Sequence, residues 1–478
     1  MSIHKRGGIG LQKNELKKCA LSIVPLPSHY ELIIEEYSED GRVMFSWVTE
    51  EQDESMTVEL DCTGHLIHLS IETNNTVSEA SSLSIEEKRR SAEQFLLSHY
   101  PEALKDLTFS QMKRLPHVER FYFEQFVMDV PLAQAGCFID VDEFGNIVRF
   151  RYNGVKTSPE IPSKLVSKED LMEYVRNSLA LQLVITKLSS DVYNVEKDEL
   201  HLVYEVHSFL NFEADALEPT LTILHDENEP ESYAALPPLP ANLMTNEFTN
   251  EEIIGITDAL ELIREVDTGP ELGIVWRKRS WVMQEKDLSI NSFFKMQSED
   301  TVKAFISNKT GKIHSFGWMH KRLGNLQLNQ EACYEKAIDF LQKVIPDYYP
   351  YLQRLTRGDE EEEEGESESF IFHAHNQGLP IADMVIVVVN RTTGLIDYYR
   401  GPNFDLHELR QMPTVPAISL EKAYRQFLEN VDFQLAWDIN YDDELESYQL
   451  VYHACDRQTR LPIRYIDATT GKIIVSNV

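Results

Sequence analysis

Alternating apolar and polar positions recur along the chain as short strands that lead into and out of a glycine turn. In five places Asp or Asn stands three or four residues before that glycine, within LDCTGHLIHL, VDEFGNIVRF, SNKTGKIHSF, NRTTGLIDYY and DATTGKIIVS. An Asp or Asn side chain can bond its own backbone in a tight turn, and glycine adopts the positive φ that closing a hairpin requires. The sequence therefore predicts five β-hairpins, with structural turn glycines at Gly64, Gly145, Gly311, Gly394 and Gly471.

Amphipathic helices are predicted beside these hairpins. Four of them begin at a capping residue that is followed by apolar residues at helical spacing, namely Ser84, Ser167, Asn329 and Ser419. Two further segments fit the same slot, Glu15–Ile23 and Thr257–Val266. Successive helix starts are 70 to 90 residues apart, which suits one helix with three or four short strands.

Matched spacings relate the second of these units to the fifth. Phe121, Pro131 and Gly145 are separated by ten and fourteen residues, and both spacings recur 249 residues later, from Phe370 to Gly394. The triplet Leu-Val-Tyr relates the third unit to the sixth in the same way, at 202–204 and 450–452. We therefore predict two triplets of units.

The predicted fold class is α+β, with six tandem units that each pack one helix on a three- to four-stranded antiparallel sheet. The third unit lacks the glycine turn and has a less regular connection at His225–Asn228 instead. The aliphatic run Met384–Val389 predicts a strand whose two faces are both covered. The predicted boundaries are 1–80, 81–163 and 164–228 for units 1 to 3, 229–250 for a proline-rich linker, and 251–325, 326–413 and 414–478 for units 4 to 6.

The segments NQGLPIADMVIVVVNRTTGLIDYYRG and LPIRYIDATTGKIIVSNV resemble the YcdB/YcdC repeated-domain family of bacilli. That family is similar to PepSY domains, small modules that occur in the propeptides of thermolysin-like metalloproteases. The resemblance is best over residues 329–478 and extends over 84–215. It implies PepSY-like units that bind or restrain another protein or a peptide, with a peptidase as the precedent.

Composition narrows the classes of partner. Acidic residues outnumber basic ones by 79 to 45, so the formal net charge is -34. Such a charge repels phosphate backbones and anionic lipid, which argues against nucleic acid and membrane surfaces as partners. The five cysteines are scattered and form no Cys-x-x-Cys pair, and the apolar patch Ala20–Leu26 is too short and too charged for a signal peptide. We expect a cytoplasmic protein.

Few residues suggest chemistry. No linear motif of a zinc protease, a phosphate-binding loop or a serine hydrolase occurs, and we expect no cofactor. His373 and His375 would project from one face of a strand, but two imidazoles need a third ligand to fix a metal. Cys455 could be activated by His453 two positions away, although small buried cysteines are the simpler interpretation. The acidic run Asp359–Glu368 predicts a solvated loop or a docking loop for a basic partner, and the paired aromatic residues at 121/123, 370/372 and 398/399 predict core.

Three hypotheses for function follow. The first is a non-enzymatic protein that binds another protein or a peptide at an exposed sheet edge, where an extended peptide can add a strand. The second is an enzyme whose site lies between units and has no linear motif, and the third is a structural or assembly protein. The lack of catalytic motifs favours the first, and the oligomeric state is left open.

Overall fold

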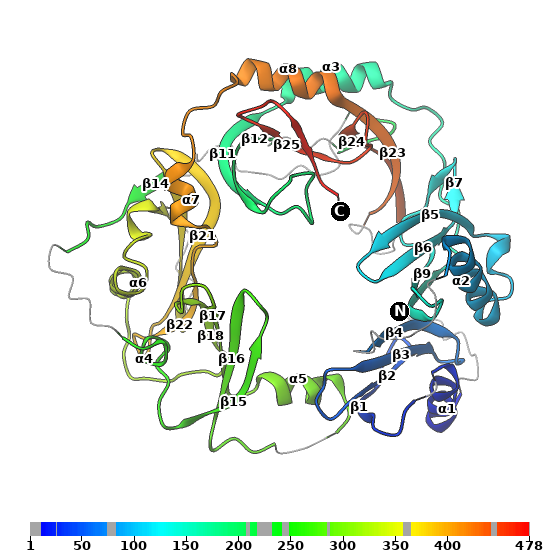
Figure 1. Cartoon of the computed structure of the whole chain (residues 1–478), viewed down its shortest axis with the longest axis horizontal. Helices are drawn as coiled ribbons and strands as arrows, with labels where there is room; N and C mark the ends of the chain where they lie inside the picture. The colour runs from blue at the N-terminus through cyan, green and yellow to red at the C-terminus, as the bar shows by residue number, and fades with distance from the viewer. Residues whose placement is uncertain are drawn as a thin grey trace, which may run out of the picture. The chain divides into compact units, whose positions relative to one another are not determined.

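The computed structural model of the chain describes residues 11–24, 26–73, 83–206, 211–217, 232–240, 248–283, 287–356, 365–440 and 447–477. Two compact bodies are formed, and both combine helices with antiparallel strands (Figure 1). The first consists of Met1–Ser163, Met283–Gln297 and Leu435–Val451, and the second of Lys164–Val282, Ser298–Gln434 and Tyr452–Val478. The α+β class is therefore confirmed.

The first body contains an eight-stranded sheet of order β1-β2-β3-β4-β10-β9-β6-β5. Two four-stranded meanders join through their last strands, which pair antiparallel with Phe150 of β10 opposite Leu69 of β4. A short hairpin of β7 (Phe126–Val127) and β8 (Val130–Pro131) interrupts the second meander. The eight strands are β1 (Glu31–Tyr37), β2 (Arg42–Val48), β3 (Ser55–Asp61), β4 (Leu66–Glu72), β5 (Thr108–Leu115), β6 (Val118–Glu124), β9 (Gly136–Asp142) and β10 (Ile147–Gly154).

The second body repeats this topology in the strand order β15-β16-β17-β18-β22-β21-β20-β19. Again two meanders join through their last strands, here β18 and β22, with Phe316 opposite Tyr399. Beyond β19 lies β14 (Ser232–Ala235), so part of the predicted proline-rich linker is a strand instead. The other strands are β15 (Leu260–Asp267), β16 (Glu271–Lys278), β17 (Thr301–Ser307), β18 (Ile313–Trp318), β19 (Leu352–Thr356), β20 (Ser367–Asn376), β21 (Leu379–Asn390) and β22 (Ile396–Arg400).

The remaining strands combine two distant parts of the chain. The hairpin of β11 (Leu181–Leu188) and β12 (Glu199–Val206) pairs through β12 with β25 (Ile463–Asp467) and then β26 (Ile473–Val475), and β11 meets β21 at a parallel bridge. Conversely, β13 (Asn211–Glu213) pairs with β24 (Ser447–Asp456), which pairs with β23 (Val431–Asn440). Each sheet is thus completed by strands more than 200 residues away in sequence.

Eight α-helices and two 3₁₀ turns occur among the described residues. The capping side chains of Ser84, Ser167, Asn329 and Ser419 accept bonds from the first turn of their helices, as the sequence predicts. Figure 1 shows α3 and α8 side by side, and the Tyr424 hydroxyl donates to the carbonyl of Arg176 between them. The helices are α1 (Lys13–Ile23), α2 (Ile85–His99), α3 (Lys168–Ser178), α4 (Asn250–Ile254), α5 (Ile290–Ser298), α6 (Gln330–Val344), α7 (Leu406–Gln411) and α8 (Leu420–Asn430), with 3₁₀ turns at Ala103–Lys105 and Tyr349–Tyr351. None of these helices is long and apolar enough to cross a membrane.

The predicted helix Thr257–Val266 is wrong. A capping box of Thr249 and Glu252 starts the short helix α4 earlier, and Gly255 ends it with φ 86°. The following residues form β15, because pairing with β16 outweighs the helical preference of the segment. The helices α5 and α7 were not predicted.

The core confirms most of the predicted aromatic positions. Phe121, Phe123, Phe370, Phe372 and Tyr399 are at most 4% exposed, whereas Tyr398 is 38% exposed and lies on the opposite side of its strand. The expectation of two covered faces at Met384–Val389 is also wrong. Val385, Val387 and Val389 are fully buried, but the residues between them are only partly buried and Met384 is 36% exposed.

The predicted irregular connection at His225–Asn228 lies outside the described residues. The described residues do show which position of the third unit corresponds to the glycine turn of the sixth unit. The Val166 amide donates to Ala214 directly after β13, and the Ile418 amide donates to Ala468 directly after β25. Ala214 therefore corresponds to Ala468, whose strand is followed by the Gly471 turn.

Candidate functional site

The two candidate metal-binding histidines lie on β20. Both are partly exposed, on the side of the strand opposite to the buried Phe370 and Phe372. The His373 ring lies 5.3 Å from that of Tyr233, and burial lowers the pKa of His375. Within the ranges that the structure describes, no three His, Cys, Asp or Glu side chains gather as a metal site would need. The described part of the chain therefore supplies no third ligand for this pair.

The three buried cysteine thiols are poor candidates for nucleophiles. Burial raises the pKa of Cys137 to about 12, and it also raises the pKa values of Cys333 and Cys455. The Cys455 thiol is buried and donates to the carbonyl of Asp432 at 3.6 Å. These environments oppose formation of a thiolate, which is the nucleophilic form.

The end of the acidic run leads into a strand. Residues 359–364 lie outside the described residues, but Glu368 belongs to β20 and pairs with Arg391. Glu366 pairs with Lys321 at 2.6 Å. The prediction of a solvated loop is therefore wrong for the end of the run, because these carboxylates anchor the start of a strand.

The glycine turns share one construction. All five glycines have φ between 66° and 92°. In four turns the Asp or Asn side chain accepts backbone N–H groups of the turn, as Asp467 does from Thr469 and Thr470. The others are Asp61, Asp142 and Asn390. Asn308 differs from this prediction, since its amide donates to Asp267 and Gly269 in the neighbouring turn.

A helix start closes each of these four turns. We call the residue directly before a helix-capping residue the pre-cap residue. A Cβ atom at the turn glycine would lie 2.6 to 3.6 Å from the pre-cap side chain, and the pre-cap amide donates to the residue after the turn Asp or Asn. The pairs are Leu11 with Gly64, Leu83 with Gly145, Leu328 with Gly394, and Ile418 with Gly471.

The turn at Gly311 is the exception. Among the described residues nothing lies within 4 Å of a Cβ built there, and its pre-cap residue, Phe248, is 46% exposed. Phe248 instead lines a pocket of about 290 Å³ in the second body. The pocket lies between α4, α6 and the turn that follows β21, and it is lined by Phe248, Glu252–Gly255, Arg322, Lys336, Asp339, Phe340, Lys343, Val344 and Gly394–Ile396.

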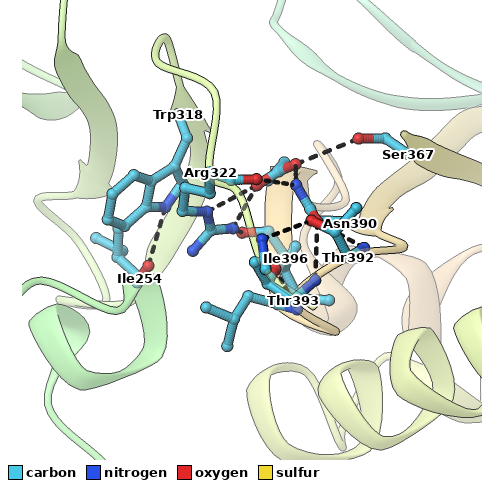
Figure 2. Close-up of polar contacts among 11 residues, drawn as sticks. Ile254, Trp318, Arg322, Ser367, Asn390, Thr392, Thr393 and Ile396 are labelled. Carbon is cyan, nitrogen blue, oxygen red and sulfur yellow. Dashed lines mark hydrogen bonds and ion pairs between the residues drawn. The ribbon is translucent and has the colours of Figure 1, made fainter. Parts of the chain in front are cut away.

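Arg322 is fixed at this pocket by a network of polar contacts (Figure 2). Its Nε donates to Asp397 at 2.8 Å, Nη2 donates to Asp397 and to the Ile396 carbonyl, and the guanidinium lies 4.2 Å from the centre of the Trp318 ring. The Trp318 Nε1 donates to Ile254 at 3.1 Å. Burial lowers the pKa of Arg322, and the Asp397 carboxylate opposes this effect. Arg322 is 90% buried in its side chain yet stays paired, as a buried cation must.

The segment that carries Arg322 is tied to the turn by its backbone. Asn390 donates to the Arg322 carbonyl at 3.0 Å and to Asp397 at 2.9 Å. Thr392 accepts the Gly324 amide through its hydroxyl at 3.0 Å, and its carbonyl would lie 2.1 Å from a Cβ at residue 324. Figure 2 shows these contacts converging on the turn. This wall of the pocket is thus held together by hydrogen bonds.

A second feature of this body is an open sheet edge at β15. Seven of its eight residues are exposed, including Leu262, Ile263 and Val266 at 40 to 55%. Three other terminal strands, β1, β26 and β5, are protected. In β1 the amide of Glu35 donates to the carbonyl of Leu288, and in β26 the Val475 amide donates to the Asn194 side chain while the Val475 carbonyl accepts from the Asn194 amide. β5 carries Lys113 and Arg114 and no strongly exposed apolar side chain, which is a common protection of edges.

Sequence reasoning missed the pocket and the β15 edge. A signal for both was available, because Thr249-x-x-Glu252 is a capping-box pattern that starts a helix at residue 250. A helix there, ended by Gly255, leaves Leu260–Asp267 free to be a strand. Arg322 had no such signal, since its partners come from residues about 75 positions away.

The fold and sites define an α+β protein of repeated helix-and-meander modules, and the comparisons identify the family. The chain belongs to the family described as "YcdB, YcdC repeated domain", which matches residues 13–154 and 245–403. It is 32% identical to the uncharacterised protein YcdB of Bacillus subtilis (strain 168), over 98% of this chain and 99% of that protein. It is 29% identical to the uncharacterised YcdC of the same strain, over 92% and 95%. The C-terminal domain of Bacillus megaterium YpeB is similar at 15% identity with a TM-score of 0.27, over 42% of this chain and 88% of that one.

Proposed function

We propose that the chain is a non-enzymatic binding protein that holds an extended segment of another polypeptide along β15. The observation that carries this proposal is the exposed edge, where three large apolar side chains stand beside backbone groups that have no hydrogen-bond partner among the described residues. An unprotected edge of this kind is a template for strand addition. The resemblance to PepSY modules suggests a peptidase as the other protein, and five unpaired cysteines support a reducing compartment such as the cytoplasm.

The register of β15 with β16 decides which backbone groups face outward. The amide of Thr268 donates to Glu271, and Val266 is opposite Gly273. Because hydrogen-bonded and non-hydrogen-bonded pairs alternate along an antiparallel ladder, the backbone groups of Glu265 and Asp267 point away from β16. Within the described residues no hydrogen bond reaches their outward amides. An added strand would therefore bond first to these two residues.

The charges along β15 specify the occupant. Glu261, Glu265 and Asp267 outnumber Arg264, and the whole chain carries a net charge of -34. A segment that alternates apolar and basic residues would match both the exposed apolar side chains and this acidic edge. A second copy of β15 would instead bring like charges together.

The test uses two displayed peptide libraries, each of about eight residues, the length of an average strand or slightly more. One alternates apolar and basic positions, and the other alternates apolar and acidic positions. We expect enrichment from the first library alone. In hydrogen exchange, a selected peptide should slow exchange at the amides of Glu265 and Asp267 and leave those of Arg264 and Val266, already bonded to β16, unchanged.

A matched pair of variants isolates the backbone contribution. Glu265→Pro removes one outward N–H and leaves the ladder with β16 in place, whereas Glu265→Gln keeps that N–H and removes only the charge. We expect the proline variant to lose binding and the glutamine variant to retain most of it. Equal enrichment of the two libraries, or protection outside β15, would overturn the proposal, and the exchange measurement decides even if the proline variant folds poorly.

We infer further that the chain consists of six PepSY-like units in two triplets, in which units 3 and 6 have exchanged their first hairpins. The repeated strand order of the two eight-stranded arrangements supports the pairing of units 1 with 2 and 4 with 5. The position of β11-β12 beside β25-β26, and of β23-β24 beside β13, supports the exchange. The helix α8 contacts β25 and β26, as a unit helix would contact its own last strands.

Deletion of residues 431–456, the hairpin that the inference assigns to unit 6, tests the exchange. If the hairpin completes the sheet of unit 3, its loss should expose β13 and α3 to hydrogen exchange while β25 and β26 stay protected. Loss of protection in β25 and β26 first would contradict the exchange.

A further inference from the structure

The pocket beside α4 exists because that helix is cut short. α4 has five residues, whereas α1, α2, α6 and α8, which also begin at a turn-covering position, have 11 to 15. Gly255 ends α4 in the left-handed conformation after little more than one helical turn. Phe340 lines the pocket, and its ring also packs on Phe316 and Tyr399 of the sheet.

Phe248 lines the pocket with an apolar side chain. In the other repeats the side chain at this pre-cap position covers a glycine turn instead. Leu83 and its counterparts close their glycine turns, but Phe248 does not reach Gly311. Among the described residues, α4 is joined to that turn by a hydrogen bond from the side-chain amide of Asn250 to the Gly311 carbonyl at 3.0 Å. Phe248 and Leu395, which are 46% and 51% exposed, therefore add apolar surface to the lining of the pocket that nothing in the described chain covers.

Cations are concentrated at the same pocket. Lys336, Asp339 and Lys343 stand at helical spacing on one exposed face of α6. Neither lysine has an ion pair or hydrogen bond with any described residue. The only other carboxylate of the lining, Glu252, is occupied in the capping box, where it accepts the Thr249 amide at 2.8 Å.

Arg322 adds a third donor. Its Nε and Nη2 are bonded to Asp397 and Ile396, and Figure 2 shows its remaining nitrogen without a partner among the residues drawn. This Nη1 atom would lie 3.9 Å from a Cβ at Gly255, which also lines the pocket. Among the described residues, the apolar pocket therefore offers an anion three donor groups, namely two lysines without an ion pair and a guanidinium nitrogen without a hydrogen bond.

We propose that this pocket binds a small free carboxylic acid that carries one aromatic or branched aliphatic group. The apolar group lies among Phe248, Phe340 and Leu395, and the carboxylate accepts from Lys336, Lys343 or Arg322. A volume of about 290 Å³ is equivalent to about ten water-sized groups, which is the size of phenylacetate. This site is separate from the β15 edge and does not depend on the function proposed for it.

Calorimetric titration of the full chain with two pairs of probes tests the proposal. Phenylacetate and 4-methylpentanoate are compared with their uncharged amides, phenylacetamide and 4-methylpentanamide. Because charge-assisted hydrogen bonds are formed only by the acids, we expect each acid to bind about tenfold more tightly than its amide. Added salt should weaken the binding of the acids and leave that of the amides unchanged.

Matched variants assign the binding to this pocket. Lys336→Gln with Lys343→Gln should weaken the binding of each acid and leave that of its amide unchanged, and Leu395→Ser should weaken acids and amides alike. Lys422→Gln, at an exposed lysine on α8 outside the pocket, is the control and should change nothing. Thermal unfolding verifies that each variant keeps its fold.

Three outcomes would overturn the proposal. They are equal affinity for acid and amide, an unchanged affinity in the double lysine variant, and binding of peptides that end in Phe or Leu with a free terminal carboxylate when neither free acid binds. The last result would identify a polypeptide C-terminus, not a free acid, as the occupant.

Discussion

The hydroxyl group of Tyr204 on β12 donates to the carbonyl of Ile418, the residue that precedes the capping residue of α8, at 2.8 Å. A corresponding bond runs from Tyr452 on β24 to Val166, which holds the same place before α3, at 3.1 Å. These tyrosines end the two Leu-Val-Tyr triplets that the sequence matched. Each one fastens its hairpin to the helix start of a distant part of the chain.

Removal of either hydroxyl should destabilise the second body. Tyr204→Phe and Tyr452→Phe leave a partly or fully buried carbonyl without its donor, so we expect the free energy of unfolding to fall by about 1 to 2 kcal/mol in each variant. Urea unfolding followed by circular dichroism measures the change. Tyr398→Phe, at a tyrosine that is 38% exposed, serves as control and should stay within about 0.5 kcal/mol. Unchanged stability in both buried variants would mean that water replaces the hydroxyl.

Thiol reactivity should follow burial. Cys62 is exposed, whereas Cys137, Cys333 and Cys455 are buried and have raised pKa values. In the native protein we expect an aromatic disulfide reagent to modify Cys62 first and the three buried thiols only after unfolding. The Cys62→Ser variant should lose the fast phase. A fast reaction at Cys455 would contradict this ordering and would support the hypothesis that His453 activates the Cys455 thiol.

Asp432 should make the free energy of unfolding depend on pH in the acidic range. Burial alone would raise its pKa, but Lys168, the Phe433 amide and Arg460 lower the pKa of Asp432 from 3.8 to about 2. Because the folded pKa is the lower one, this carboxylate stabilises the fold above the unfolded pKa, and the stabilisation is lost as the pH falls from about 4 to about 2.

Comparison with Asp432→Asn measures this contribution. We expect the variant to be less stable near neutral pH by about 1 kcal/mol, after allowance for screening by solvent, and the difference to vanish below about pH 2. Asp258→Asn, at an exposed aspartate, should show no such pH dependence. A difference between wild type and Asp432→Asn that persists in strong acid would indicate a packing effect instead.

The sequence predicted local features well because their causes are local. The capping bonds of Ser84 and Ser419, and the turns at Asp142 and Asp467, join residues two to four positions apart. The prediction for the segment that forms β15 was wrong for the opposite reason. Its strand conformation depends on pairing with β16 and on the end of α4 at Gly255.

The candidate sites were predicted less well, because they depend on long-range contacts. Arg322 meets Asp397 across 75 positions, and β12 meets β25 across more than 250. No pattern within one segment encodes such a meeting. His373 and His375, which share a local pattern, gain no third ligand among the described residues from the fold.

The two kinds of pre-cap residue should respond oppositely to truncation. Leu83 covers the Gly145 turn, where its Cδ1 would lie 2.6 Å from a Cβ, and its amide donates to Glu143 at 2.9 Å. Leu83→Ala removes the apolar cover but keeps the backbone bond, so we expect a loss of about 1 to 2 kcal/mol in the free energy of unfolding, less than for a fully buried leucine. Phe248 is 46% exposed and covers no turn, so Phe248→Ala should cost at most about 0.5 kcal/mol although a larger side chain is removed. Guanidinium unfolding of both variants tests whether truncation of the smaller side chain costs more free energy of unfolding than truncation of the larger one. A larger loss for Phe248→Ala would show that this ring supports the fold as Leu83 does, and that the Gly311 turn needs its cover after all.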